Sequence, residues 1–175
     1  DKLNKKAKQQ KLDHRIETLQ RSMDELKFEE EEFDIIWSEG AIYITGFENG
    51  ITMWRKFIKP KGFIALSEIT YTTNSRPEEL EMFWKKSYPG IDTASNKIKI
   101  LETQGYSLVA FFILPQYCWI NNYYNPIKER LDKFINKHGN KKEIIDFVEN
   151  EKKEIETYEK YKEFYSYGFY IAQKN

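Results

Sequence analysis

Two glutamates stand where carboxylates can do chemistry. Glu39 follows the apolar run Phe33–Trp37, and Glu68 lies near the end of the run Phe63–Ile69. Short apolar runs bounded by turn residues are typical of buried parallel strands. In open α/β sheets, ligands bind beyond the carboxyl ends of such strands. We therefore expect both glutamates to face a ligand, where a carboxylate can accept a proton or hold an amine.

Aromatic side chains form a second set of candidates. Residues 116–125 are unusually aromatic, and another tyrosine follows the first of the two runs. Aromatic faces attract sulfonium and quaternary ammonium ions, so we expect these side chains to line a lid over a substrate. They are Tyr43, Tyr117, Trp119, Tyr123 and Tyr124. The alternatives are aromatic packing of a loop onto the sheet and, for the two glutamates, a partly solvated place at a strand end.

Other common chemistries lack their residues. His14 and His138 have no partner at metal-ligand spacing, and Cys118 stands alone, so we expect no metal site. A Gly-x-Ser-x-Gly nucleophile elbow is absent, which disfavours a Ser-His-Asp hydrolase. A single cysteine fits a reducing compartment, and we expect a cytoplasmic protein.

Length and charge limit the class of protein. The chain has 175 residues, of which 40% are hydrophobic and 16% aromatic, enough for one domain with a real core. Its 28 basic and 28 acidic residues balance, so the electrostatic footprint of a nucleic-acid reader is absent. No apolar run approaches the ~18–20 residues that span a bilayer. We expect neither a nucleic-acid nor a membrane partner.

Helices and strands alternate along the chain. Apolar spacings of three and four predict helices over residues 1–12, 46–58, 77–86, 93–104, 126–137 and 141–163. Apolar runs and alternation predict strands over residues 15–19, 33–37, 63–69, 107–114 and 164–172. The order predicts an α/β fold with an antiparallel strand at its end.

Three segments, in order, resemble class I S-adenosylmethionine (SAM)-dependent methyltransferases, especially the small-molecule methyltransferase type 11 (UbiE-like) group. They are Ser22–Phe28, Phe33–Tyr43 and Trp54–Glu68, which are similar to the family's acidic segment, its fourth strand and its fifth strand with the preceding helix. The resemblance implies a Rossmann-like sheet with helices on both faces and a terminal antiparallel strand. None of the eight glycines forms a Gly-x-Gly pair, so we expect the first two strands and the cofactor loop to lie upstream of Asp1.

The resemblance also implies residues that hold the cofactor. Asp24 would accept a hydrogen bond from the adenine amino group, with Met23 framing the ring. Alternatively, Asp24 caps a short helix that begins at Glu25. The strand end beyond Trp37 would stand at the point where the strand order reverses. The cofactor candidates are Ser22, Met23, Asp24, Trp37, Ser38 and Glu39.

The implied activity is methyl transfer from SAM to a small-molecule acceptor, with S-adenosylhomocysteine as product, in a bacterial enzyme. Glu39 and Glu68 would be its catalytic residues. Residues 1–175 would form one partial domain, in which residues 77–163 supply the substrate-side helices and lid. A second interpretation is a non-catalytic methyltransferase-like interaction or dimerisation module, since an open sheet edge invites pairing into a homodimer. A nucleotide-dependent oxidoreductase is a weaker third interpretation.

Overall fold

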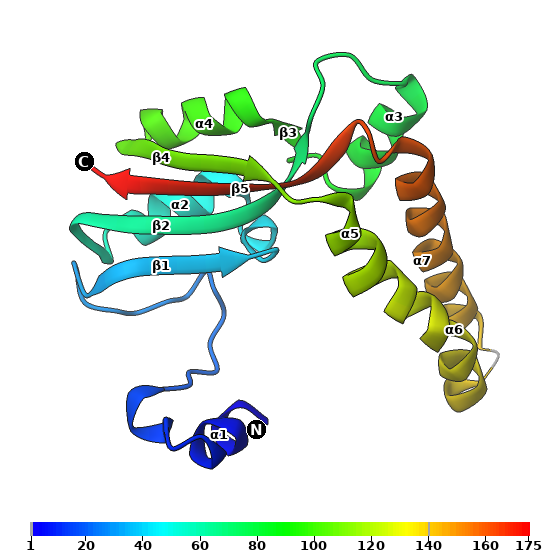
Figure 1. The fold of residues 1–175 in the computed structure, drawn as a ribbon, viewed down its shortest axis with the longest axis horizontal. Helices are drawn as coiled ribbons and strands as arrows, with labels where there is room; N and C mark the ends of the chain where they lie inside the picture. Colours follow the sequence, from blue (N-terminus) through cyan, green and yellow to red (C-terminus); the bar gives the residue numbers. More distant parts are fainter. Residues whose placement is uncertain (1, 140) are drawn as a thin grey trace.

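The computed structural model describes residues 2–139 and 141–175, which build one mixed sheet with helices around it (Figure 1). Its four long strands lie in the order β1 (Phe33–Glu39), β2 (Ile58–Tyr71), β5 (Tyr165–Lys174) and β4 (Tyr106–Ile113). A short strand, β3 (Asp92–Thr93), pairs with the end of β2. Each of the four long strands coincides with a predicted one.

Strand directions follow from the connections. Strands β1 and β2 are parallel, and α2 (Phe47–Arg55) crosses between them. Strand β5 is antiparallel to both of its neighbours, β2 and β4. The predicted α/β fold with a terminal antiparallel strand is therefore confirmed.

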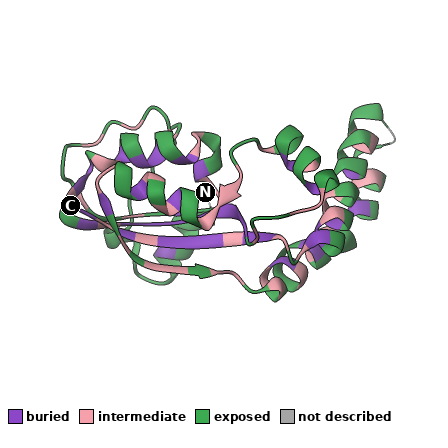
Figure 2. Cartoon of the chain, turned by 90° about the horizontal axis from the view of Figure 1, so that it is seen from above, coloured by how far each residue is buried: buried purple, intermediate pink, exposed green. Residues whose placement is uncertain are grey.

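One face of the sheet carries the main core. Helices α2 and α4 (Ala94–Thr103) pack there and bury their apolar stripes against β2, β4 and β5 (Figure 2). The hydroxyl of Tyr106 on β4 donates to the carbonyl of Ile51 in α2 at 2.9 Å, which ties helix to sheet inside the core. The α2–β2 unit thus has a fixed position, and with it the turn that follows β1.

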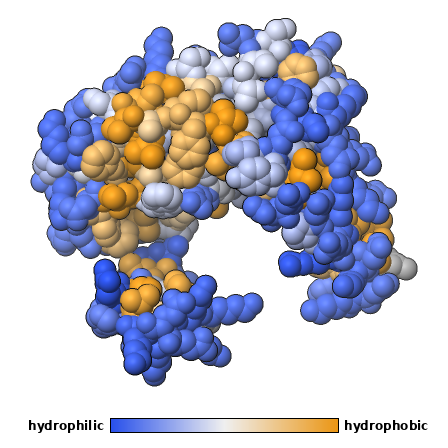
Figure 3. Space-filling view, in the orientation of Figure 1, coloured by the Kyte–Doolittle hydropathy of each residue, from blue (hydrophilic) through white to orange (hydrophobic). Residues whose placement is uncertain are grey.

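The opposite face is largely bare in the described chain. Ile35 and Trp37 of β1 and Val109 and Phe112 of β4 are each between 46% and 62% exposed. Figure 3 shows an apolar surface over the sheet on this face. The prediction that β1 is a buried strand is therefore wrong for this face, because the described helices α2 and α4 cover the other one.

A helical arm extends from the carboxyl end of the sheet (Figure 1). It consists of α5 (Gln116–Trp119), a π-helical turn (Ile120–Tyr124), α6 (Asn125–His138) and α7 (Lys142–Tyr161). Helix α3 (Glu78–Ser87) packs beside it and shares its aromatic core. Among the described helices, none combines the length and apolarity that crossing a membrane requires.

The first part of the chain differs from its prediction. Helix α1 (Lys2–Gln9) is present, but the strand predicted over residues 15–19 is not. A 3₁₀ turn occupies Asp13–Arg15, and the chain continues without pairing until β1. A strand needs a neighbour for its backbone hydrogen bonds, and the described chain offers this segment none. The predicted first helix starts at Asp1, which lies outside the described residues.

Replacing Tyr106 by Phe tests the contact between α2 and the sheet. The substitution leaves the Ile51 carbonyl buried without its donor, so the free energy of unfolding should fall by about 1 kcal/mol in urea titrations. Tyr117→Phe is the matched control, since that side chain is 58% exposed, and it should change nothing measurable. Equal stability of the two variants would contradict this role of the Tyr106 hydroxyl.

Candidate active-site cleft

A cleft of about 580 Å³ opens at the carboxyl ends of β1 and β2. The sheet forms one wall, and α3, α5 and α7 contribute the others. Three carboxyl groups line it: Glu39, Glu68 and Glu154. Six aromatic side chains line it as well: Tyr43, Trp84, Tyr88, Trp119, Tyr123 and Tyr167. The structure thus brings both predicted catalytic glutamates together with three of the five predicted substrate-side aromatics.

Glu68 forms the charged floor of the cleft. Its carboxylate is 1% exposed and lies 3.6 Å from the ammonium of Lys97, which is also 1% exposed. The Tyr88 hydroxyl donates to the same carboxylate oxygen. Burial raises the pKa of Glu68, and the charge of Lys97 opposes that rise. Burial lowers the pKa of Lys97, and the charge of Glu68 is the main effect that opposes this fall. Each charge therefore depends on the other.

Lys97 and Tyr88 are site residues that the sequence reasoning missed. Lys97 reaches Glu68 from α4, where it also donates to the Gly90 carbonyl at 3.2 Å and lies 4.6 Å from the centre of the Phe47 ring. One feature of the sequence indicates that Lys97 is buried. Lys97 lies four residues before Leu101, so it occupies the buried stripe of an amphipathic helix, where a lysine needs a partner.

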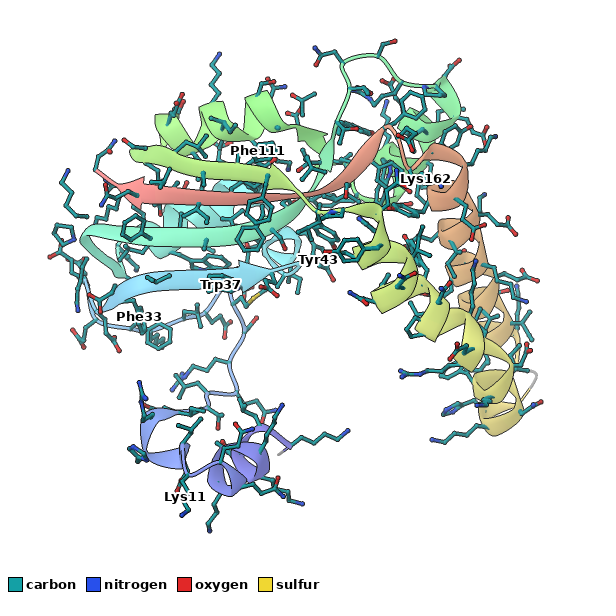
Figure 4. All side chains as sticks on the ribbon, viewed as in Figure 1. Lys11, Phe33, Trp37, Tyr43, Phe111 and Lys162 are labelled. Carbon is teal, nitrogen blue, oxygen red and sulfur yellow. The ribbon has the colours of Figure 1, made fainter. Side chains whose placement is uncertain are left out.

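Glu39 lies at the open side of the cleft. The Trp37 indole donates to its carboxylate at 2.8 Å, and both side chains point to the bare face of the sheet. Gly40 then turns the chain with a φ of +53°, and its N–H donates to the Ser67 hydroxyl at 3.0 Å. This turn leads to Tyr43, which lies where the sheet meets the helical arm (Figure 4). The Tyr43 ring meets the Tyr88 ring edge-on at a centroid distance of 6.1 Å.

Trp119 organises the aromatic wall. Its indole donates to the Ser166 hydroxyl of β5 at 2.9 Å, and its ring stacks on Tyr167 at 5.0 Å and on Tyr158 at 4.7 Å. It is 5% exposed, so it fixes the arm to the sheet and presents little surface to a ligand. The packing alternative therefore describes Trp119 well.

Of the three remaining predicted substrate-side aromatics, only one lines the cleft. Tyr123 lines the cleft and is 48% exposed. Tyr124 is buried beneath it and donates to Glu154 at 3.1 Å. Burial raises the pKa of Glu154, with Tyr124 opposing. Tyr117 is exposed and is not part of the cleft wall.

The predicted cofactor residues do not all lie at one site. Met23 and Asp24 line a separate hollow of about 190 Å³ beside the last turn of α2, where the Trp54 indole donates to the Met23 carbonyl at 3.3 Å. Helix α2 runs back from the cleft end of the sheet, so this hollow lies away from the cleft. The Ser22 hydroxyl donates to Asp24 and lowers the pKa of its carboxyl. No helix begins at Glu25, so the capping alternative is not observed.

Ser38, on β1 just before Glu39, has an unsatisfied hydroxyl. Its side chain is 8% exposed on the α2 side of β1, and its Oγ has no hydrogen-bond partner within the described structure. A buried polar atom without a partner destabilises a fold, so it marks a place that a ligand can complete.

Comparisons with known proteins place this arrangement. No family model and no curated protein matches the chain. Among solved structures, a SAM-dependent methyltransferase from Geobacter sulfurreducens in complex with S-adenosyl-L-homocysteine superposes with a TM-score of 0.80 and 14% identity, over 98% of this chain and 70% of that one. The fold is the class I methyltransferase fold. A SAM-dependent methyltransferase from Thiobacillus denitrificans superposes with a TM-score of 0.74 and 16% identity, over 98% of this chain and 70% of that one.

One neighbour differs in its chemistry. The cyclase SpnF matches with a TM-score of 0.74 and 16% identity, and the chain spans 60% of its length while 97% of this chain is covered. A shared fold therefore does not by itself fix the reaction, which must be argued from the cleft.

Lys97→Met tests the buried pair. With the ammonium gone, Glu68 is a buried acid without a counter-charge, and the variant should lose about 3–5 kcal/mol of stability at pH 7. The folded-state pKa of Glu68 then rises further above its ordinary value of 4.5, so the loss should shrink as the pH falls and the carboxyl protonates. Unfolding in urea at pH 5 and pH 7 measures both effects.

The matched control for this variant is Lys99→Met in the same helix, whose side chain is exposed. It should stay within about 0.5 kcal/mol of the parent. Adding Glu68→Gln to Lys97→Met should restore part of the lost stability. Equal losses for Lys97→Met and Lys99→Met would show that the buried pair does not hold the site.

Proposed function

We propose that the protein is a SAM-dependent methyltransferase that transfers a methyl group to a small-molecule acceptor bound in the cleft. The observation that carries the proposal is the position of the cleft in a class I methyltransferase fold: it lies at the carboxyl ends of β1 and β2. Ligands of open α/β sheets bind at such strand ends. The acceptor, the bacterial origin, the cytoplasmic location and the type 11 (UbiE-like) group belong to the proposal as well.

The residues of the chain fit the reacting end of the cofactor. SAM supplies an electrophilic methyl group, so the protein mainly has to align the acceptor and exclude water. Ser38, with its unsatisfied buried hydroxyl, and Glu39, at the cleft mouth, would hold that end. Met23 and Asp24 remain our proposed contacts for adenine, although in this structure they lie beside α2.

The two cleft carboxylates have different tasks. Glu39 is on the open side, where it can take a proton from an acceptor. Glu68 is held by Lys97 and Tyr88, which makes it a fixed negative charge that orients the acceptor. Tyr43 and Tyr123 flank the opening and limit the access of water.

A non-catalytic interaction module is the second candidate function. It is favoured by the bare apolar face around Trp37 and Phe112 and by β1, which is an edge strand within the described chain. Exposed apolar faces and edge strands are sites of association, including association of two copies. The module needs no cofactor, so cofactor binding separates the two candidates.

Calorimetric titration with S-adenosylhomocysteine tests the methyltransferase. We titrate this chain and, in parallel, the full product of its gene, and we expect saturable binding. Asp24→Asn should weaken the affinity about tenfold, because an amide replaces a charged acceptor for the adenine amino group. Asp13→Asn is the matched control and should bind like the parent.

The outcomes separate three conclusions. No binding to either form would overturn the methyltransferase and leave the interaction module. Binding with equal affinity for Asp24→Asn and Asp13→Asn would overturn only the adenine contact. Binding weakened by Asp24→Asn alone would support both the activity and the role of Asp24.

A further inference from the structure

The walls of the cleft carry one sign of charge. Three carboxyl groups line it, from β1 (Glu39), β2 (Glu68) and α7 (Glu154), and no lysine or arginine among the described residues does so. Lys97 compensates Glu68 from behind, within the core. The exposed carboxylate of Glu39 and the half-buried one of Glu154 have no such cation recorded beside them in the described structure. A cleft of this kind concentrates cations and repels anions.

The remaining wall is aromatic, and its faces suit the same charge. Tyr43 and Tyr88 meet edge-on at 6.1 Å, and Tyr123 and Tyr167 stand on the side of the arm. The faces of aromatic rings attract alkylammonium groups, and the attraction grows when water is excluded. Rings and carboxylates that converge from different elements are the arrangement that binds an organic ammonium ion.

We propose that the cleft binds an organic ammonium head group, so that the methyl acceptor of this protein is an amine. The bound ammonium would first give one proton to the Glu39 carboxylate, because only the neutral amine has a lone pair that can accept a methyl group. That the bound amine is the methyl acceptor rests on the proposed function. That the cleft binds an ammonium group rests on the residues of the cleft alone. A volume of about 580 Å³ lies within the ~300–1,000 Å³ of ordinary small-molecule sites, so the head group can carry a substituent of moderate size.

A second observation points to an oxygen on that substituent. Trp84 lines the cleft and is 8% exposed, and within the described residues its indole N–H has no hydrogen-bond partner. A buried donor without a partner is costly, and a hydroxyl or carboxylate oxygen of the ligand would satisfy it. An amino alcohol or amino acid offers both features, whereas a simple hydrocarbon offers neither and an anionic ester offers only the oxygen.

The test compares three probes of nearly equal shape by intrinsic tryptophan fluorescence, to which Trp84 and Trp119 contribute from the cleft. Choline carries the cation and a hydroxyl, 3,3-dimethylbutan-1-ol is its neutral isostere, and 3,3-dimethylbutyrate is an anion of similar size. We expect choline to bind saturably and the other two to bind at least about tenfold more weakly. Equal affinities for choline and its neutral isostere, or no choline binding, would overturn the inference.

Variants locate the site. Glu39→Gln and Glu154→Gln should each weaken choline binding severalfold while keeping the shape of the side chain. Glu149→Gln is the matched control, since this residue is an exposed glutamate of α7 outside the cleft wall. Circular dichroism and urea unfolding confirm that all three fold. A loss of affinity equal in Glu149→Gln and Glu154→Gln would show that choline binds elsewhere.

Failure of this inference and failure of the proposed function remain distinguishable. Binding of S-adenosylhomocysteine without selectivity for choline would overturn the amine acceptor and leave the methyltransferase. Selective binding of choline without S-adenosylhomocysteine would support the ammonium site and overturn the methyltransferase. S-adenosylhomocysteine suits this purpose because its sulfur is uncharged, so it does not compete through a sulfonium.

Discussion

The ion pair between Glu68 and Lys97 constrains the whole cleft end of the molecule. Two charges that are each 1% exposed are stable only while both are present, because the loss of one leaves the other desolvated. The pair therefore fixes three parts of the chain at once: the end of β2, helix α4 and, through Tyr88, the segment that follows α3. That rigidity gives the cleft a floor whose charge does not move when a ligand enters.

Trp119 plays the corresponding part for the opposite wall. Its hydrogen bond to Ser166 and its stacking on Tyr167 and Tyr158 hold the helical arm against β5, so Glu154 on α7 faces the same space as Glu68. The two anchors are independent, one ionic and one aromatic. Between them lie Tyr43 and Tyr123, which are exposed enough to meet a ligand. A rigid frame with accessible aromatic edges suits a site that must align an acceptor and exclude water.

Much of this could be predicted from the sequence where the signal is local. The apolar runs before Glu39 and Glu68 indicated parallel strands, as β1 and β2 are, and in the structure both glutamates line one cleft. Lys97 and Tyr88 were not predicted as site residues, because they contact Glu68 from positions 29 and 20 residues away in the sequence. The strand expected over residues 15–19 failed because pairing depends on a neighbouring strand and not on the segment alone. The same holds for β1, whose outer face is covered only if another element packs there.

The central claim is that the cleft between the sheet and the helical arm receives the ligand. Three of the four tryptophans report on it, since Trp84 and Trp119 line the cleft while Trp54 lies beside Met23 at the far end of α2. Indole N–H signals in a nitrogen-15 correlation spectrum, recorded as choline is added, test the claim most directly. We expect the signals of Trp84 and Trp119 to shift together with one binding curve while the signal of Trp54 stays in place. A shift of Trp54 alone, or no shift of Trp84 and Trp119 at saturation, would contradict it.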